Sequence, residues 1–183
     1  SHAGRINAEM TITRMGDNHF YVLSAAGAEI RDVDYLTQAM TAEENVEIVN
    51  ITDKRGVLVL AGPKAREVMV KVTEEKLDNA SFPWLTGKDI SIAGLPTRAL
   101  RINYVGELGW ELHPPIEHLE KIYDALWQAG EEFDIADFGL YAVDSLRMEK
   151  AYRHWGGELT NEVTMIDADM ERFIKLDKDN FIG

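Results

Sequence analysis

The sequence "RINYVGELGWELH" covers residues 101–113 and decides the fold of the region around it. Apolar residues alternate with polar ones, two glycines and two carboxylates interrupt the pattern, and the alternation then resumes with Trp110 and Leu112 in phase. Period-two alternation is typical of a β-strand with one buried face, and glycines permit a tight turn. The pattern predicts a β-hairpin whose tip is formed by residues 106–109.

Within this hairpin, the alternation assigns a face to each side chain of the second strand. Glu111 shares its face with Gly109 and His113, whereas Trp110 and Leu112 point to the other face. Trp110 and Leu112 therefore indicate the core side of the sheet. Whether Glu111 contacts water or a ligand depends on what covers its own face.

Upstream, three further patterns predict secondary structure. Residues 9–14 and 19–24 flank the turn-forming sequence "MGDN" and predict an opening hairpin. Residues 28–40 carry apolar side chains at helical spacing, and residues 46–52 ("VEIVNIT") alternate like a strand. The sequence thus predicts that the chain begins with a β-hairpin, followed by a helix and a further strand.

The remaining patterns mix strands and helices in an irregular order. Residues 56–72 predict a short buried strand that leads through Pro63 into a helix. Residues 116–130 give the clearest helical pattern, with Gly130 as its expected C-cap, and a second helix is expected after Asp137. The order favours an α+β fold with a mixed, largely antiparallel sheet and packed helices.

Composition excludes several classes of function. The 183 residues carry a net charge of -13, without a Lys/Arg cluster, so neither nucleic acid nor an anionic membrane surface is an expected partner. The absence of cysteine excludes disulfides, thiolate zinc sites and a cysteine nucleophile. The five histidines show no metal-binding spacing, and no metal site is expected.

Three stretches together resemble a known family. Residues 102–112 ("INYVGELGWEL"), 138–159 ("FGLYAVDSLRMEKAYRHWGGEL") and 175–183 ("KLDKDNFIG") resemble the folate-binding region of the glycine-cleavage T-protein (aminomethyltransferase) family. Within that family, the similarity is greatest to the C-terminal part of dimethylglycine and sarcosine dehydrogenases. The resemblance runs over residues 1–183 and implies one folate-binding region. It also implies a fragment that lacks the family's N-terminal segment and C-terminal β-barrel.

The resemblance implies a set of site residues. Glu111 matches the glutamate that holds the pterin ring through two acceptor oxygens, and Glu107 matches a second glutamate of the same motif. Tyr21 and Trp155 match aromatic positions that line the folate site. Glu9 occupies the position of the family's essential aspartate and is the implied catalytic residue. From the residues alone, the pattern around Glu111 favours a plain hairpin tip. A half-buried Tyr21, a buried Trp155 beside a turn and a solvated Glu9 also remain open interpretations.

Two positions depart from the family pattern. Glu9 replaces aspartate, which keeps the charge and moves it by one methylene group. Val143 replaces an arginine that contacts folate in the family. The charged contact of that arginine is therefore absent here, or another residue supplies it. Arg147 and Glu149 are two positions apart and therefore do not face each other on a helix, so Arg147 is expected to form a structural ion pair with another residue.

The resemblance implies transfer of a one-carbon unit to tetrahydrofolate, as in the glycine-cleavage reaction or in a dimethylglycine or sarcosine dehydrogenase. FAD is expected only if an upstream oxidoreductase half exists in the parent protein. The implied partners are a small-molecule folate and an aminomethyl carrier protein or an FAD domain, in the cytoplasm or in the mitochondrial matrix of a eukaryote. The alternative is a folate-binding or interaction module without turnover. The iron-sulfur-maintenance branch of the fold relies on a cysteine motif, which this chain lacks.

Overall fold

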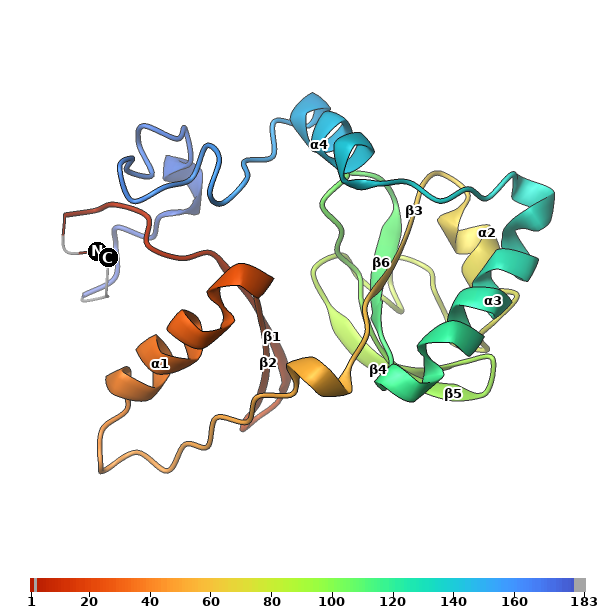
Figure 1. Cartoon of the computed structure of the whole chain (residues 1–183), viewed down its shortest axis with the longest axis horizontal. Helices are drawn as coiled ribbons and strands as arrows, with labels where there is room; N and C mark the ends of the chain where they lie inside the picture. Colours follow the sequence, from red (N-terminus) through yellow and green to blue (C-terminus); the bar gives the residue numbers. More distant parts are fainter. Residues whose placement is uncertain (2, 180–183) are drawn as a thin grey trace. The chain divides into compact units, whose positions relative to one another are not determined.

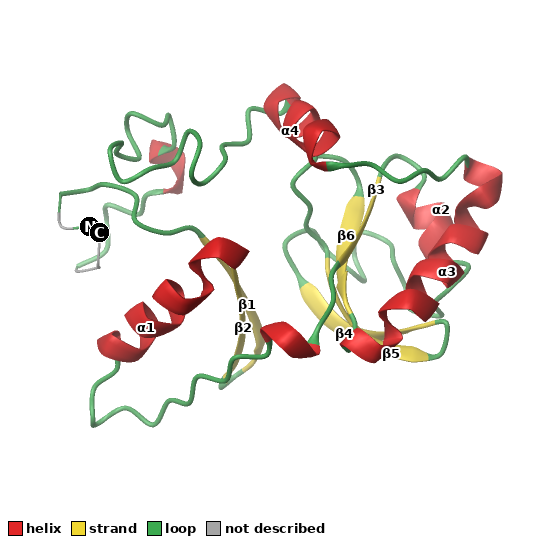
Figure 2. Ribbon diagram, in the orientation of Figure 1, coloured by secondary structure: helices red, strands yellow, loops and turns green. Residues whose placement is uncertain are grey.

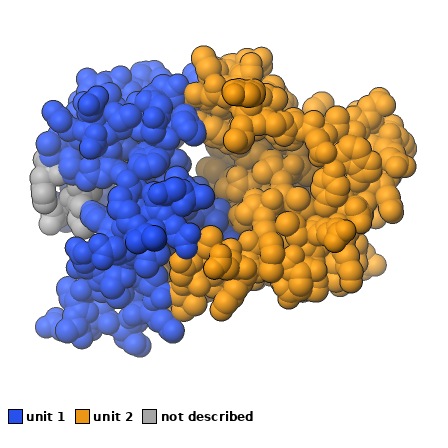
Figure 3. Space-filling model, viewed as in Figure 1, with its two compact units in different colours: residues 1–12, 21–48, 151–183 blue, residues 13–20, 49–150 orange. Residues whose placement is uncertain are grey.

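The computed structural model describes residues 1 and 3–179. The chain divides into two compact units (Figure 3), of which unit 1 contains residues 1–12, 21–48 and 151–183 and unit 2 contains residues 13–20 and 49–150. The expected α+β class is confirmed, because short strands in antiparallel pairs occur together with helices. None of the helices in the described residues is both long enough and apolar enough to span a membrane.

The opening hairpin and the first helix follow the sequence patterns. Strand β1 (Met10–Gly16) pairs with β2 (His19–Ser24), and α1 (Glu29–Ala39) follows after a 3-10 turn (Figure 1). The base of the hairpin belongs to unit 1 and its tip, residues 13–20, belongs to unit 2. Both predicted elements are confirmed.

The predicted strand over residues 46–52 is wrong. This segment is irregular and ends in a 3-10 helix, Thr52–Lys54. Val46 and Val49, two of the residues that produced the alternating pattern, are 57% and 59% exposed. A strand needs a neighbouring strand to satisfy its backbone groups, and among the described residues none pairs with this segment.

A four-stranded antiparallel sheet organises unit 2. Its strands are β3 (Leu58–Ala61), β4 (Gly87–Ile92), β5 (Leu95–Leu100) and β6 (Gly109–His113), in the order β3-β6-β5-β4. Strand β6 is central: Leu112 pairs with Leu58 of β3 and with Ala99 of β5. The motif that carries Glu111 therefore lies inside the sheet, between two partners.

Two helices cover one face of this sheet, and the hydrophobic core lies between these helices and the sheet. Helices α2 (Ala65–Met69) and α3 (Leu119–Gly130) lie side by side on that face (Figures 1 and 2). Trp110 is fully buried there and packs edge-on against Phe82, with 6.3 Å between the ring centroids. The buried members of this core are Leu60, Ala65, Val68, Met69, Leu77, Phe82, Ile90, Ile92, Ala99, Trp110, Leu112, Ile122, Leu126 and Ala129.

The predicted hairpin tip at residues 106–109 is wrong, because the loop before β6 is wider. Strand β5 ends at Leu100, and the Arg101 amide then donates to the Thr86 carbonyl. Asn103 organises the loop: its Oδ1 accepts from the amides of Val105 and Gly106. Such a local side-chain bond competes with strand pairing. Residues 101–108 consequently form a structured loop rather than a two-stranded ribbon.

The two glycines of the motif have different roles. Gly106 has a φ of +71°, a left-handed conformation that is unfavourable for residues with a Cβ atom. A Cβ on Gly109 would instead fall on the carbonyl oxygen of Leu60 and lie 2.9 Å from Cα of Ala61. Glycine at position 109 thus allows β3 to approach β6, whereas glycine at position 106 allows the loop to turn.

The last two helices agree with the sequence except at one end. Helix α4 spans Leu140–Glu149, as expected after Asp137. Gly130 is the last residue of α3 and not its left-handed cap, because the chain continues as a 3-10 helix, Glu131–Phe133. Asp134 takes the left-handed conformation instead, with a φ of +56°.

Candidate functional site

Glu111 lies in the middle of β6, on the sheet face that α2 and α3 do not cover. Its neighbours in the register are Val59 of β3 and Leu100 of β5. Val59 is 41% exposed and Leu100 is 1% exposed, so Glu111 marks the boundary between an open and a covered part of this face. Its side chain is 21% exposed. The predicted face of Glu111, opposite Trp110 and Leu112, is confirmed.

A buried imidazole lies next to this carboxylate. The Nε2 atom of His113 is 3.4 Å from Oε2 of Glu111, and the His113 side chain is 1% exposed. Arg55 fixes this end of β6, because its guanidinium donates to the His113 carbonyl oxygen at 2.7 Å. The two side chains are therefore close neighbours on one face of β6.

An arginine–carboxylate pair continues the same face on the neighbouring strands. Arg98 of β5 pairs with His113 in the register and donates to Asp89 of β4 in a bidentate arrangement, at 2.8 and 2.9 Å. The hydrogen bond from Arg98 lowers the pKa of Asp89, and the charges of Arg98, Arg55 and His19 lower it further. The carboxylates of Glu111 and Asp89 and the basic side chains of His113 and Arg98 thus lie on the same face of the sheet.

The tip of the opening hairpin covers the outer part of this face. A Cβ built on Gly87 of β4 would lie 2.9 Å from the Thr13 side chain and 3.3 Å from Met15. The charge of His19 at the same tip acts on Asp89. The hairpin tip therefore lies over β4, and Glu111 is displaced from it toward the open edge at β3.

Glu107, the second glutamate of the motif, lies in the loop before β6. Its carboxylate is 3.4 Å from Nζ of Lys150 at the end of α4, and its side chain is 41% exposed. Its carbonyl oxygen accepts a hydrogen bond from Asn103. Glu107 is therefore held by two contacts that close the loop.

Three of the predicted site residues belong to unit 1. Glu9 is exposed immediately before β1, and within the described part of the chain its carboxylate makes no hydrogen bond or ion pair. Tyr21 is on β2 and is only 7% exposed. Trp155 lies in the loop after α4 and forms a bridge with Leu159. Glu107 and Glu111, in contrast, belong to unit 2.

Trp155 already has a cationic neighbour. The Arg31 guanidinium lies 4.7 Å from the centroid of the indole ring, a cation–π arrangement, and also donates to Asp32 at 2.6 and 2.9 Å. The indole Nε1 of Trp155 is buried and lacks a hydrogen-bond partner among the residues that the structure describes. One ring face is therefore occupied by Arg31.

Helix α4 holds the position where the family pattern has an arginine. Val143 is half-buried there and offers no charge. Arg147 pairs with Asp144 one turn earlier, at 2.8 Å from Nε to Oδ1. The expected structural ion pair of Arg147 with a residue other than Glu149 is confirmed.

The sequence reasoning missed Arg98 and Asp89 as neighbours of the Glu111 face. Alternation alone places His113 beside Glu111, but the register of β4 and β5 depends on pairing that no local pattern reveals. The last four residues of the closing motif, 180–183, lie outside the described residues. Over residues 1 and 3–179, no three acidic or histidine side chains form a group that could hold a metal ion.

Comparisons with known proteins agree with these features. A family model, the GCVT N-terminal domain, matches residues 1–178. Mitochondrial dimethylglycine dehydrogenase from Homo sapiens is 41% identical over 182 residues, which are 98% of this chain and 21% of that protein. Aminomethyltransferase from Thermoanaerobacter sp. (strain X514) is 33% identical over 184 residues, which are 100% of this chain and 49% of that protein.

The chain thus spans about one fifth of the length of such dehydrogenases and about half of an aminomethyltransferase. Among solved structures, a chain of heterotetrameric sarcosine oxidase from Corynebacterium sp. U-96, in complex with pyrrole 2-carboxylate, matches with a TM-score of 0.60. The sequences are 23% identical, and the match covers 74% of this chain and 68% of that one. At this identity the likeness concerns the fold.

Proposed function

Because this chain belongs to the GCVT N-terminal domain family, we propose that it is the folate-binding part of a protein that transfers aminomethyl or methylene groups to tetrahydrofolate. The relatives that it matches are, by name, aminomethyltransferases and dimethylglycine dehydrogenases. The observation that carries the proposal is the position of Glu111: a partly exposed carboxylate in a rigid central strand, beside a buried imidazole.

The carboxylate of Glu111 suits the hydrogen-bonding edge of a pterin ring. A pterin presents a ring N–H and an exocyclic amine on one edge, and a carboxylate can accept from both. Oε2 of Glu111 is close to His113, while Oε1 has no hydrogen-bond partner in the described part of the chain. A strand with partners on both sides keeps such a group in one orientation, which favours binding because little freedom remains to be lost.

In this proposal, Glu9 is the catalytic carboxylate. A negative charge beside the reacting nitrogens would orient the folate, stabilise a cationic one-carbon donor or relay a proton. Glu9 has no competing ion pair among the described residues, which leaves its charge available. Tyr21 and Trp155 would line the cofactor with aromatic surface, and Glu107 would support the loop that precedes Glu111.

The proposed assembly includes other proteins or domains. We infer a folate as the small-molecule partner, and an aminomethyl carrier protein or an FAD-containing oxidoreductase domain as the source of the one-carbon unit. FAD would supply oxidation of the donor in a dehydrogenase-like parent protein. The proposed location is the cytoplasm, or the mitochondrial matrix in a eukaryote. The matched dimethylglycine dehydrogenase is named as mitochondrial.

A second candidate function is folate binding without turnover. Val143 favours it, because an aliphatic side chain on α4 cannot make the charge-assisted contact of an arginine. The two candidates differ at Glu9. Turnover requires its carboxylate, whereas binding alone depends chiefly on Glu111.

The test is calorimetric titration of the 183-residue chain with 5-formyltetrahydrofolate, a stable reduced folate. We expect saturable binding that Glu111→Gln weakens by about tenfold or more, the scale of one charge-assisted hydrogen-bonded pair. Glutamine keeps the size of the side chain but removes the charge and one acceptor. Glu120→Gln, at an exposed position of α3, is the matched control and should leave the affinity unchanged.

Equal affinities for wild type and Glu111→Gln would contradict the assignment of Glu111. Turnover is tested separately, with Glu9→Gln in the longest form of the protein that shows activity. A loss of rate with retained folate binding supports the transferase function. Unchanged rate would remove Glu9 from the mechanism and favour another carboxylate.

A further inference from the structure

Two arginines of unit 2 converge on one neutral side chain. Arg66 of α2 and Arg101 at the start of the loop before β6 both donate to Oδ1 of Asn79, at 2.9 and 2.7 Å. Arg101 also donates to the carbonyl oxygen of Phe82. Two cations therefore share an uncharged acceptor, an arrangement that brings like charges together.

Neither arginine has a carboxylate partner in the part of the chain that the structure describes. Two arginines without a carboxylate partner are unusual in a chain where 32 acidic residues outnumber 19 basic ones. Arg101 is only 8% exposed, and a buried cation is normally paired. Its burial and the charge of Arg66 both lower the pKa of Arg101.

Arg66 retains most of its hydrogen-bonding capacity. A guanidinium has five N–H donors, and the hydrogen bond to Asn79 uses one of them. The Nε atom of Arg66 is buried and has no hydrogen-bond partner among the described residues. Arg66 is therefore an incompletely satisfied cation that Asn79 holds in place, next to a second cation, Arg101.

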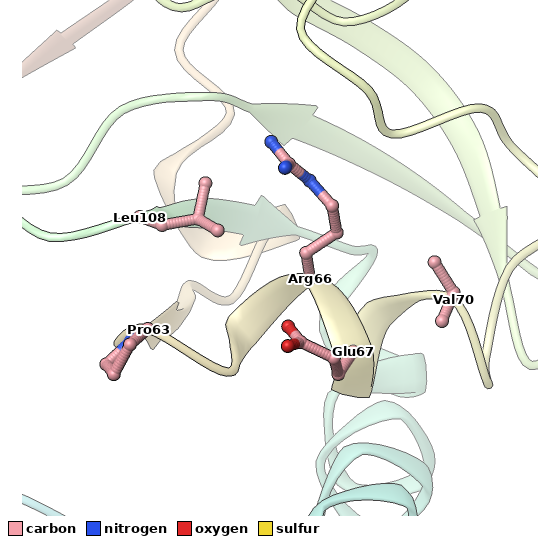
Figure 4. A pocket seen from close by; sticks show the side chains of 5 residues that line it. All are labelled: Pro63, Arg66, Glu67, Val70 and Leu108. Carbon is pink, nitrogen blue, oxygen red and sulfur yellow. The ribbon is translucent and has the colours of Figure 1, made fainter.

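A hollow of about 360 Å³ lies beside this arginine. Its apolar wall consists of Pro63, Val70 and Leu108, and its polar wall consists of Arg66 and Glu67 (Figure 4). The Glu67 carboxylate is already engaged, 3.4 Å from Nζ of Lys64. The hollow therefore combines one unneutralised positive charge with aliphatic surface.

The hollow is separate from Glu111. Arg101 lies 5.9 Å from the ring centroid of Trp110, and Trp110 points to the face covered by α2 and α3. Glu111 is the next residue along β6 and points to the opposite face. A group bound at Arg66 would therefore not occupy the surface proposed for the pterin.

We propose that Arg66, held by Asn79, binds the carboxylate of a small organic acid whose apolar part rests on Pro63, Val70 and Leu108. A carboxylate would offset one of the two positive charges and accept from the free donors of Arg66. The aliphatic wall distinguishes such a ligand from a bare inorganic anion. Apolar lining with few polar groups is the usual composition of a small-molecule site.

The test uses cyclohexanecarboxylate as the probe, with cyclohexanecarboxamide and inorganic phosphate as comparison ligands. Binding to the 183-residue chain is followed by NMR chemical-shift titration, including the Nε–Hε signal of Arg66. We expect saturable binding of the carboxylate, at least tenfold weaker binding of the neutral amide, and weaker binding of phosphate. Arg66→Gln should weaken carboxylate binding by about tenfold or more.

Lys121→Gln is the matched control, because it removes one positive charge from an exposed position of α3. It should change the affinity less than twofold. Glu111→Gln should also leave carboxylate binding unchanged, so this proposal and the proposed folate site succeed or fail separately. The proposal is overturned if the probe does not bind, if Arg66→Gln binds it equally well, or if the amide or phosphate binds as tightly.

Discussion

The side chain of Lys150 lies directly over Gly106, and its ammonium group reaches the neighbouring Glu107 at 3.4 Å. Lys150 is the C-terminal cap of α4, and Gly106 is in the loop that leads into β6. The end of the helix thus rests on the loop through a lysine stem and an ion pair. The contact joins two segments that are distant in sequence and leaves no space for a side chain at position 106.

Gly106→Ala is expected to destabilise the chain more than Gly94→Ala. Both glycines have positive φ, at 71° and 80°, which costs an alanine about 1–2 kcal/mol. A Cβ at position 106 would also collide with Cγ of Lys150, whereas a Cβ at position 94 has open space. Urea denaturation measures both free energies of unfolding.

The collision is isolated by repeating both substitutions in a Lys150→Ala background. Most of the additional cost of Gly106→Ala should disappear there, because Cγ and Cδ of residue 150 are gone and only its Cβ, at 3.2 Å, remains. The cost of Gly94→Ala should not change. An additional cost that persists without the lysine stem would mean that the loop itself, and not the helix contact, requires glycine.

Gly109→Ala is expected to destabilise the chain by about 1–3 kcal/mol, the range of overpacking in a well-packed interior. The obstructing atoms, the Leu60 carbonyl oxygen and Cα of Ala61, are backbone and cannot rotate away. Gly16→Ala is the control, since a Cβ there would meet only Cβ of His19 at 3.9 Å. Similar unfolding midpoints for the two variants would contradict the close approach of β3 and β6.

Asp78 should titrate well below an ordinary carboxyl group. Hydrogen bonds from the side chain and amide of Ser81, and from the amide of Ala80, lower the pKa of Asp78 to about 2. NMR titration of the Asp78 carboxyl carbon measures this value directly. Ser81→Ala should raise it toward 3.8, whereas Ser91→Ala, at an exposed position of β4, should leave it unchanged.

The same lowered pKa fixes the direction of a pH effect on stability. A carboxyl group whose pKa is lower in the folded state stabilises the fold above its unfolded pKa, near 3.8, and loses that contribution as the pH falls toward 2. The stability difference between wild type and Asp78→Asn should therefore be constant above about pH 5 and shrink below pH 4. A difference that grows on acidification would contradict the assignment.

Local patterns predicted the parts of the fold that depend on local contacts. Leu119, Ile122 and Leu126 repeat at helical spacing, and α3 forms where they predict it. Residues 46–52 alternate equally well but form no strand, because a strand also needs a partner that the pattern does not supply. The loop before β6 was mispredicted for a related reason: the bonds of Asn103 outweigh the alternation around it.

In the candidate site, too, local patterns predicted some neighbours, and others depend on contacts between distant segments. Alternation alone correctly placed Glu111 and His113 on one face, opposite Trp110. The neighbouring pair of Arg98 and Asp89 depends on the register of three strands, which no single stretch encodes. The convergence of Arg66 and Arg101 on Asn79 depends on long-range packing in the same way.

The central position of β6 also determines when in folding Glu111 acquires its surroundings. Strands β4 and β5 are joined by the two-residue turn Ala93–Gly94 and can pair early, since closing a short loop costs little entropy. Strand β6 must then find β3, whose partner residues lie far upstream in the chain. Such distant pairing is slow to form. We therefore expect the surface around Glu111 to form late in folding, in the step that closes the sheet.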